Sequence, residues 1–270
     1  MNQKNFIIDV DKCTGCNLCV VACKDEHVDS SYIPWSKPQP EGGHFWINVK
    51  AVERGTIPRV RMSFLPIMCQ HCEDAPCITA CPEGAIKTRD DGLIWIDGGK
   101  CTGCGDCQPA CPYDVIYKND DLNIAQKCTG CAHRLDVGEL PRCVDVCPHE
   151  AILFDHADSK DSSLEFLHPE HEAKPRVFWR GLPKPWITGA IINAKADEVI
   201  IGACVKATNL TDGTNFKTSS NEFGEFWLTG LLLNNAYRVD ILADGYSDFS
   251  TNVVMNKEQD IGLIELTTAV

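Results

Sequence analysis

Cysteine is the residue type that gives this chain most of its chemistry. Sixteen of its seventeen cysteines fall into four quartets of related spacing. The quartets are Cys13, Cys16, Cys19 and Cys23; Cys69, Cys72, Cys77 and Cys81; Cys101, Cys104, Cys107 and Cys111; and Cys128, Cys131, Cys143 and Cys147. Three thiolates at three-residue intervals wrap one iron–sulfur cubane, and a fourth cysteine on the following helix reaches a second cubane. The pattern therefore predicts sixteen iron ligands and four [4Fe–4S] clusters.

Two other uses of paired cysteines fit this pattern less well. Structural zinc sites need two Cys-x-x-Cys pairs, whereas the quartets add a third cysteine, and three of them end in Cys-Pro at Cys81, Cys111 and Cys147. That ending is typical of ferredoxin loops. Disulfides are disfavoured because half-cystines this close compete for partners and no secretory signal precedes them. The remaining Cys204 lies in an alternating apolar run and is predicted to be a lone thiol.

The quartets share local sequence as well as spacing. Lys-Cys-Thr-Gly-Cys begins at Lys12, Lys100 and Lys127, which indicates internal duplication. A lysine beside a first ligand can raise the potential of a cluster through its charge, but exposed charges are strongly screened, so we expect these lysines to be solvated. His71 lies between two cysteines of the second quartet. With four cysteines available there, we expect it to hydrogen bond or pack rather than bind iron.

Short strands and helices must position these loops. Residues 6–10 are strand-like and lead into the first loop, and a helix begins at Val20, as in half of a ferredoxin. Residues 24–65 lack cysteine and form an insertion with an irregular proline- and glycine-rich part and a strand-like run at 45–49. We expect the insertion to cap the outer clusters or to dock on another subunit.

The composition changes once along the chain. Residues 1–155 hold all four quartets, residues 156–185 are largely polar and predicted to be a linker, and residues 186–270 show short alternating apolar runs. These runs, at 187–191, 203–207, 223–226, 237–241 and 261–264, predict an antiparallel β-sandwich. His156, His168 and His171 in the linker have no regular spacing and are not expected to bind metal. The fold class is thus α+β, with ferredoxin-like modules followed by a small all-β domain.

Charge and hydropathy exclude two classes of partner. The formal net charge is −13, and thiolate-bound clusters would add negative charge, so nucleic acid is not expected to bind. No apolar run is long enough to span a membrane, and the residues after Met1 lack the h-region of a signal peptide. We expect a cytoplasmic protein, with export alongside a signal-bearing partner as the alternative.

The quartet order and the segment from Cys69 to Cys77 resemble the four-cluster iron–sulfur subunits of the dimethyl-sulfoxide-reductase superfamily of molybdopterin enzymes. The segments 202–205 and 221–226 resemble a carboxypeptidase-regulatory-like or transthyretin-like, Ig-like sandwich. Further similar segments, at 43–48, 53–56, 125–129 and 174–177, are typical of the small subunits of enzymes that hydroxylate, dehydroxylate or transhydroxylate phenols. The resemblance implies a large catalytic subunit that carries the molybdopterin cofactor, which this chain itself would lack.

The resemblance also implies how the quartets combine, with one ferredoxin module nested in another. The first quartet exchanges its last cysteine with the fourth, and the second with the third. The implied ligand sets are Cys13, Cys16, Cys19 and Cys147; Cys23, Cys128, Cys131 and Cys143; Cys69, Cys72, Cys77 and Cys111; and Cys81, Cys101, Cys104 and Cys107. The clusters of the first and fourth quartets are expected nearer the large subunit.

The expected function is electron transfer to or from a catalytic subunit that acts on phenolic aromatics. The chain has no nucleotide loop and no nucleophile with a base, so we expect no active site of its own. The complete third quartet favours exchange with an external electron carrier and hence a net redox reaction. Alternatives are the same role for another substrate of the superfamily, a free polyferredoxin, and a zinc-bound adaptor. The sandwich is expected to serve assembly.

Overall fold

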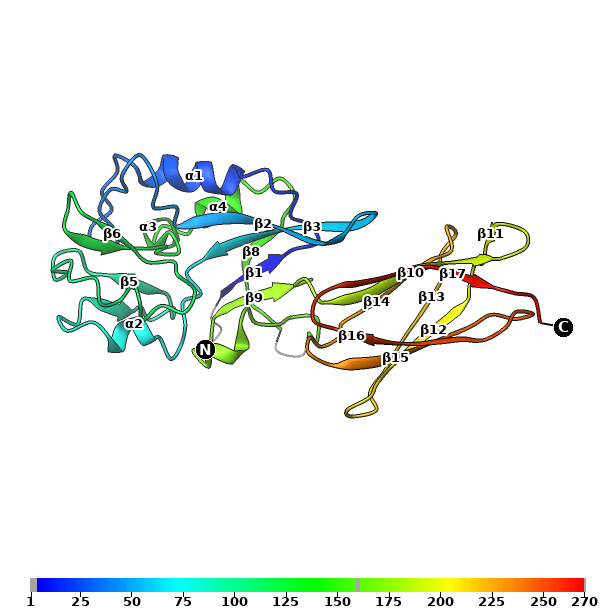
Figure 1. Cartoon of the computed structure of the whole chain (residues 1–270). Coiled ribbons are helices and arrows are strands. Elements are labelled where there is room, and N and C mark those ends of the chain that lie inside the picture. Colours follow the sequence, from blue (N-terminus) through cyan, green and yellow to red (C-terminus); the bar gives the residue numbers. More distant parts are fainter. Residues whose placement is uncertain (1–3, 159–160, 270) are drawn as a thin grey trace. The chain divides into compact units, whose positions relative to one another are not determined.

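The structure is a computed structural model that describes residues 4–158 and 161–269. The chain forms two compact units (Figure 1). The first contains the residues up to Val52 together with Ser63–Leu182, and the second contains Glu53–Met62 together with the residues from Pro183 on. Residues 1–3 and 270, at the outer bounds of the predicted domains, and residues 159–160, within the predicted linker, lie outside the described residues. The predicted absence of a signal peptide rests in part on residues 1–3.

The first unit is built around a three-stranded sheet in the order β8-β1-β9. Its strands are β1 (Asn5–Asp9), β8 (Ile152–Asp155) and β9 (Val177–Arg180). β1 pairs antiparallel with β8 and parallel with β9. Phe6 and Ile8 point from β1 into the core, where Trp179 of β9 is fully buried. The strand predicted at 6–10 is therefore present and forms the centre of this sheet.

Short helices and hairpins carry the cysteine loops. The helices are α1 (Leu18–His27), α2 (Pro76–Thr79), α3 (Ala132–Leu135) and α4 (Arg142–Asp145). The hairpin strands are β4 (Ile86–Thr88), β5 (Ile94–Ile96), β6 (Tyr117–Asn119) and β7 (Ile124–Gln126). Among the described helices only α1 exceeds a single turn, because the chain between ligands is too short for longer helices. More of the described residues lie in strands than in helices, and the helices serve mainly to position cysteines.

The insertion at 24–65 contains an unexpected long hairpin. β2 (Ile47–Thr56) and β3 (Arg59–Met68) pair with each other, and residues 53–62 at their joined ends group with the second unit. There Arg59 forms ion pairs with Asp260 at 2.9 Å and with Glu225 at 3.2 Å. Arg54 lies over the Trp186 ring, 4.5 Å from its centroid. The hairpin tip is thus part of the second unit, although the sequence assigns it to the first.

The predicted linker is also built into the fold. Of its residues, 161–182 group with the first unit. β9 lies in this segment and pairs with β1, and a 3₁₀ turn, η1, spans Pro169–His171. The linker prediction failed here because the segment is polar on average, yet Val177 and Trp179 alternate with polar residues and fill the core.

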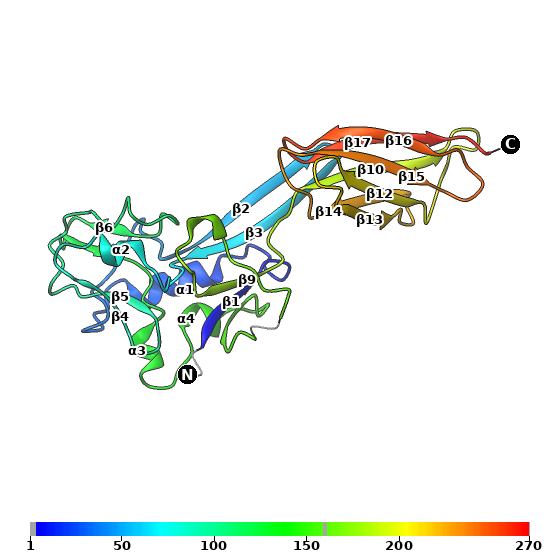
Figure 2. The same ribbon diagram turned by 90° about the horizontal axis from the view of Figure 1, so that it is seen from below.

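The second unit is a β-sandwich of two sheets (Figure 2). One sheet contains β11 (Glu198–Val199), β10 (Trp186–Asn193), β14 (Glu225–Thr229) and β17 (Gln259–Leu266). The other contains β13 (Asn215–Ser219), β12 (Cys204–Asn209), β15 (Ala236–Leu242) and β16 (Phe249–Val254), in that order. Apolar side chains of both sheets form one core. The sandwich was predicted to be antiparallel, but β17 pairs parallel with β10.

The longest helix, α1, has 10 residues. Among the residues that the structure describes, no helix is long and apolar enough to cross a membrane.

Candidate iron–sulfur centre

The repeated Lys-Cys-Thr-Gly-Cys segments form turns that need glycine. Gly15, Gly103 and Gly130 have φ of +72°, +70° and +67°, a region that side chains disfavour. A Cβ atom would also collide with a neighbour at each position; at Gly103 it would lie 2.4 Å from the backbone oxygen of Asn123. The turns therefore allow the two flanking cysteines to approach the same point.

The structure gathers the sixteen quartet cysteines into four groups of four. We name them group A (Cys13, Cys16, Cys19, Cys147), group B (Cys23, Cys128, Cys131, Cys143), group C (Cys69, Cys72, Cys77, Cys111) and group D (Cys81, Cys101, Cys104, Cys107). Groups A, B and D each line a cavity. In group C, the electrostatic neighbours of Cys72 are the other three members. These groups are the ligand sets that the resemblance implies, and the binding of one cluster by each group stays a prediction.

The groups follow one another in the order A, B, C, D. Cys19 of group A interacts electrostatically with Cys23 of group B, and Cys69 of group C interacts with Cys128 of group B. Cys107 of group D interacts with Cys77 of group C. Neighbouring groups A and B are built from the first and fourth quartets, and C and D from the second and third. They are neighbours because the last cysteine of each quartet belongs to the group of its partner quartet.

The two ends of this series are open and its middle is enclosed. Cys16 in group A and Cys104 in group D are exposed. All four cysteines of group B are buried, as are Cys69, Cys72 and Cys77 of group C. The arrangement therefore offers two places where an electron could enter or leave, joined through a dry interior.

The chemistry of the donor sets fits iron–sulfur clusters. Zinc sites use two Cys-x-x-Cys pairs, whereas the cysteines of groups A, B and D each line a pocket in which a fourth cysteine comes from a distant quartet, the arrangement of ferredoxin-type [4Fe–4S] sites. Burial raises the pKa of Cys19 to about 12, and its neighbours Cys13 and Cys147 contribute to that rise. Four such thiolates repel one another, so they need the positive charge that iron would bring.

Backbone amides are aimed at the sulfurs. Gly130 N–H donates to Cys128 Sγ at 3.3 Å, and Ala125 N–H donates to Cys101 Sγ at 3.3 Å. After the Cys-Pro endings, Ala85 and Ala151 donate to Cys81 and Cys147, each at 3.3 Å. Such donors stabilise negative charge on sulfur and tune cluster potentials.

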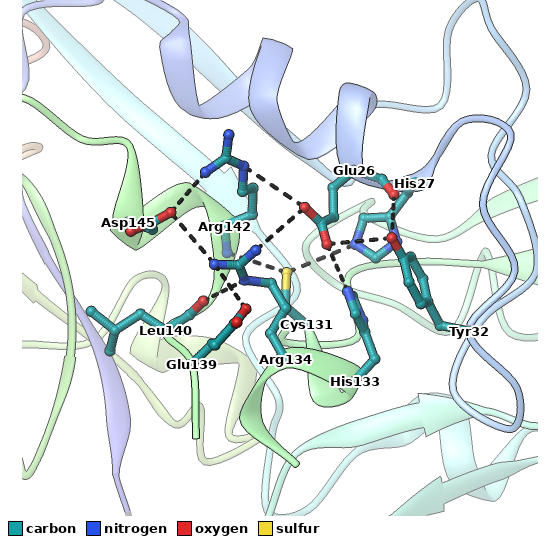
Figure 3. Close-up of polar contacts among 10 residues, drawn as sticks. All are labelled: Glu26, His27, Tyr32, Cys131, His133, Arg134, Glu139, Leu140, Arg142 and Asp145. Carbon is teal, nitrogen blue, oxygen red and sulfur yellow. Dashed lines mark hydrogen bonds and ion pairs between the residues drawn. The ribbon is translucent and has the colours of Figure 1, made fainter. Parts of the chain in front are cut away.

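A charged network surrounds Cys131 of group B (Figure 3). Glu26 Oε1 lies 2.9 Å from His133 Nε2, and Glu26 Oε2 lies 3.6 Å from Arg134 and 3.7 Å from Arg142. The backbone N–H of Arg142 donates to Cys131 Sγ at 3.4 Å. The network joins α1 to α3 and α4, so it holds in place the eleven residues that separate Cys131 from Cys143 in the fourth quartet.

His27, also in Figure 3, faces the same sulfur. Its Nε2 lies 3.8 Å from Cys131 Sγ. Burial and the nearby His133 lower the pKa of His27 to about 3, so the ring is neutral. Its Nδ1 has no hydrogen-bond partner among the described residues, so a ring proton on Nε2 is the one that has an acceptor within reach, Cys131 Sγ. Sequence reasoning missed His27 because it lies four residues after Cys23, outside any ligand motif.

The lysines beside the first ligands differ from one another. Lys12 and Lys100 are exposed, as expected. Lys127 is only 2% exposed, so the prediction that it is solvated is wrong; packing against β5 encloses it. His71 behaves as expected: its Nδ1 accepts the Ile94 N–H at 3.0 Å and its ring stacks on Phe6.

The other singled-out residues belong to none of the four groups. Cys204 is exposed on β12, while Ala203 and Val205 beside it are buried. Atoms of His168, Glu170 and His171 that could bind a metal lie within 4.8 Å of one another on an exposed turn. The irregular spacing of the histidines in the sequence did not reveal this grouping. It depends on η1 and on a hydrogen bond of 3.0 Å between His168 and Glu170.

Comparisons with known proteins match two parts of the chain. A 4Fe-4S dicluster domain matches residues 12–85, a second 4Fe-4S dicluster domain matches residues 60–157, and a carboxypeptidase regulatory-like domain matches residues 186–267. The pyrogallol hydroxytransferase small subunit of Pelobacter acidigallici is 36% identical over 284 residues, which cover 98% of this chain and 100% of that protein.

Two further relatives match a shorter part of the chain. The arsenate respiratory reductase iron-sulfur subunit ArrB of Shewanella sp. is 34% identical over 231 residues, covering 64% of this chain and 94% of that protein. The thiosulfate reductase electron transfer subunit PhsB of Salmonella typhi is 36% identical over 162 residues, covering 59% of this chain and 79% of that protein. The similarity therefore spans proteins with different named substrates.

Proposed function

Because this chain belongs to the family of iron–sulfur electron-transfer subunits of molybdopterin oxidoreductases, we propose that it carries electrons by means of four [4Fe–4S] clusters between a large molybdopterin subunit and an external carrier. The observation that carries the proposal is the series of four cysteine groups with open ends at Cys16 and Cys104. When bound, each cluster supplies one-electron transfer at a potential set by its surroundings. This chain supplies no active site of its own in the proposal.

The protein's residues have three tasks in this function. The sixteen cysteines of groups A to D hold the iron. The amides of Gly130, Ala125, Ala85 and Ala151 donate to sulfur and stabilise its negative charge. Buried apolar residues such as Ile94 and Ile152 exclude water, which keeps electrostatic effects in the interior strong. Group A faces the large subunit in this proposal, and group D faces the external carrier.

We assign the partner subunit to phenolic substrates. The support is the 36% identity to a pyrogallol hydroxytransferase small subunit over 98% of this chain. The relatives that match a shorter part of the chain have other substrates in their names. A long match that includes the C-terminal unit therefore favours the phenol-modifying group over the others.

Iron and molybdenum analysis of the native protein tests the wiring and the partner. Four clusters require about sixteen iron atoms per chain, and the complex should co-purify with molybdenum. Iron far below that number would reject the four clusters. A protein that migrates alone without molybdenum would be a free polyferredoxin, and a colourless protein with zinc would be an adaptor.

We consider two reaction types for the complex, and the completeness and exposure of group D favour one of them. A hydroxyl transfer between phenols moves no net electrons, as the name of the hydroxytransferase relative suggests. Reductive dehydroxylation or hydroxylation with water needs two electrons to enter or leave for each substrate. Group D is complete and exposed at Cys104, so it favours net redox chemistry with an external carrier.

An assay of the purified complex on phenolic substrates decides between the two types. Turnover should depend on an artificial electron donor or acceptor if the reaction is net redox. Turnover that is indifferent to both, with hydroxyl groups merely exchanged, would establish the transfer reaction instead.

A further inference from the structure

Lys127 is a buried cation between the two enclosed cysteine groups. It is 2% exposed, whereas Lys12 and Lys100, which hold the same place in the repeated segment, are exposed. It directly precedes Cys128 of group B. The fold thus buries the lysine of one copy of the motif and exposes the lysines of the other two.

The ammonium group of Lys127 contacts backbone carbonyls. Its Nζ donates to the carbonyl of Ile94 and, at 3.0 Å, to that of Cys128. Among residues 4–158 and 161–269, no carboxylate forms an ion pair with it. A buried ammonium is rarely found without an opposite charge nearby, so its counter-charge must come from another source.

The cysteine groups B and C are the nearest candidates for that source. Lys127 directly precedes Cys128 of group B and its Nζ donates to the carbonyl of Cys128 at 3.0 Å. Cys77 of group C is also an electrostatic neighbour of Lys127. The same ammonium therefore lies beside cysteines of both groups.

The position of the ammonium is held from the side of group C. Ile94 N–H donates to His71 Nδ1 at 3.0 Å, and the carbonyl of the same residue accepts from Lys127. His71 lies between Cys69 and Cys72, so residue 94 links the loop of group C to the loop of group B. This fixed geometry keeps the charge near both groups without solvent to screen it.

We propose that Lys127 is the shared counter-ion of groups B and C and raises the midpoint potentials of both clusters, which makes it a positioning residue for electron transfer between the two halves of the series. The inference rests on the four-cluster function proposed above. A fixed positive charge favours the reduced, more negative form of a nearby cluster. Lys100, exposed beside group D, should have little such effect because water screens it.

The test compares K127M, K127R and K100M in the intact complex, with iron analysis and redox titration followed by electron paramagnetic resonance. Methionine retains much of the length of lysine without its charge, and arginine retains the charge. In K127M, two of the four midpoint potentials should fall by the equivalent of about a tenfold change in the reduction equilibrium, about 59 mV for one electron. The wild-type values should persist in K100M.

Each outcome has a defined meaning. Unchanged potentials in an iron-replete K127M would overturn the role of Lys127. If K127M loses iron while K127R and K100M retain it, the need for a positive charge is supported. Loss of iron in both K127M and K127R would show that the site requires the shape of lysine, and would overturn the charge argument. Wild-type protein with fewer than four titrating centres would instead reject the four-cluster function on which the inference rests.

Discussion

At the scale of single residues, the surroundings of Cys131 show how one sulfur can be tuned. His27 Nε2 lies 3.8 Å from Cys131 Sγ, and the neutral ring can donate one hydrogen bond. Hydrogen bonds to charged groups contribute about 1.5–3 kcal/mol. The donor stabilises the more negative, reduced form of the cluster that group B is proposed to hold.

We predict that His27→Phe lowers the midpoint potential of one cluster. The fall should correspond to about a tenfold change in the reduction equilibrium. Phenylalanine preserves ring packing against Trp46, whose centroid lies 4.7 Å away. Redox titration of the complex measures the shift. His44→Phe is the control, since the ring of His44 stacks on Tyr117; equal shifts in both variants would contradict the prediction.

Glu26 offers a second residue-scale prediction, which depends on pH. Burial raises the pKa of Glu26, but the hydrogen bond with His133 and the charge of Arg134 outweigh it, so the pKa lies below its usual 4.5. The ion pairs therefore stabilise the fold above pH 4.5, and this stabilisation is lost as the pH falls through the lowered pKa.

Glu26→Gln should accordingly destabilise the chain at pH 7. We expect a loss of about 1–2 kcal/mol, less than for a fully buried pair because solvent screens part of the charge. Anaerobic urea denaturation, followed by cluster absorbance, measures it. The difference between wild type and variant should shrink below pH 4.5; a difference that stays constant with pH would show that charge is not responsible.

At the scale of elements, the turns of the repeated segments explain why short loops can hold ligands. Gly103 and Gly105 both have positive φ, +70° and +89°, but only Gly103 is crowded. A Cβ at Gly105 would meet Gln108 Oε1 no closer than 3.7 Å, whereas one at Gly103 would overlap the backbone of Asn123. Comparison of alanine substitutions at Gly103 and Gly105 therefore separates the effect of backbone strain from the effect of steric overlap.

Gly103→Ala should disrupt group D, and Gly105→Ala should not. Strain alone costs about 1–2 kcal/mol, which the fold can absorb. Steric overlap with a backbone atom requires the turn to move, so the Gly103 variant should lose on the order of four iron atoms per chain, one cubane. Iron analysis of both variants is the measurement. Equal iron content would mean that the turn relaxes without loss of its ligands.

At the scale of the whole molecule, all sixteen grouped cysteines lie in the first unit, and the second unit contributes none. The role expected for the sandwich from its sequence, assembly with the large subunit, stays a prediction. The hairpin tip at 53–62 complicates any truncation, because Arg54 and Arg59 pair with Glu258, Glu225 and Asp260 of the sandwich. Removal of the sandwich alone would leave these arginines without their partners.

We predict that a variant without residues 186–270, in which a short turn also replaces residues 53–62, retains its clusters but binds the large subunit more weakly. Cluster spectra test the first part, and the yield of co-purified large subunit tests the second. A second variant that retains the hairpin tip controls for the trimmed loop. Loss of the spectra in both variants would show that the sandwich completes the cluster-binding unit.

The features that depend on local spacing could be predicted from the sequence alone. The quartets, the glycine turns and the Cys-Pro endings act over a few residues, so the ligand loops and the all-β character of the C-terminal part could be predicted. Resemblance added the exchange of last cysteines between quartets. The grouping of Cys13 with Cys147 could not be derived from spacing, because it depends on packing between the two ends of the first unit.

Which copies of a motif are buried depends on tertiary contacts. Lys12, Lys100 and Lys127 have the same following residues, yet only Lys127 is enclosed, because its carbonyl partner Ile94 lies 33 residues away in the sequence. The assignment of residues 53–62 to the sandwich and the parallel pairing of β9 with β1 likewise arise from long-range contacts. Burial and pairing are properties of the folded chain as a whole, so a local pattern cannot encode them.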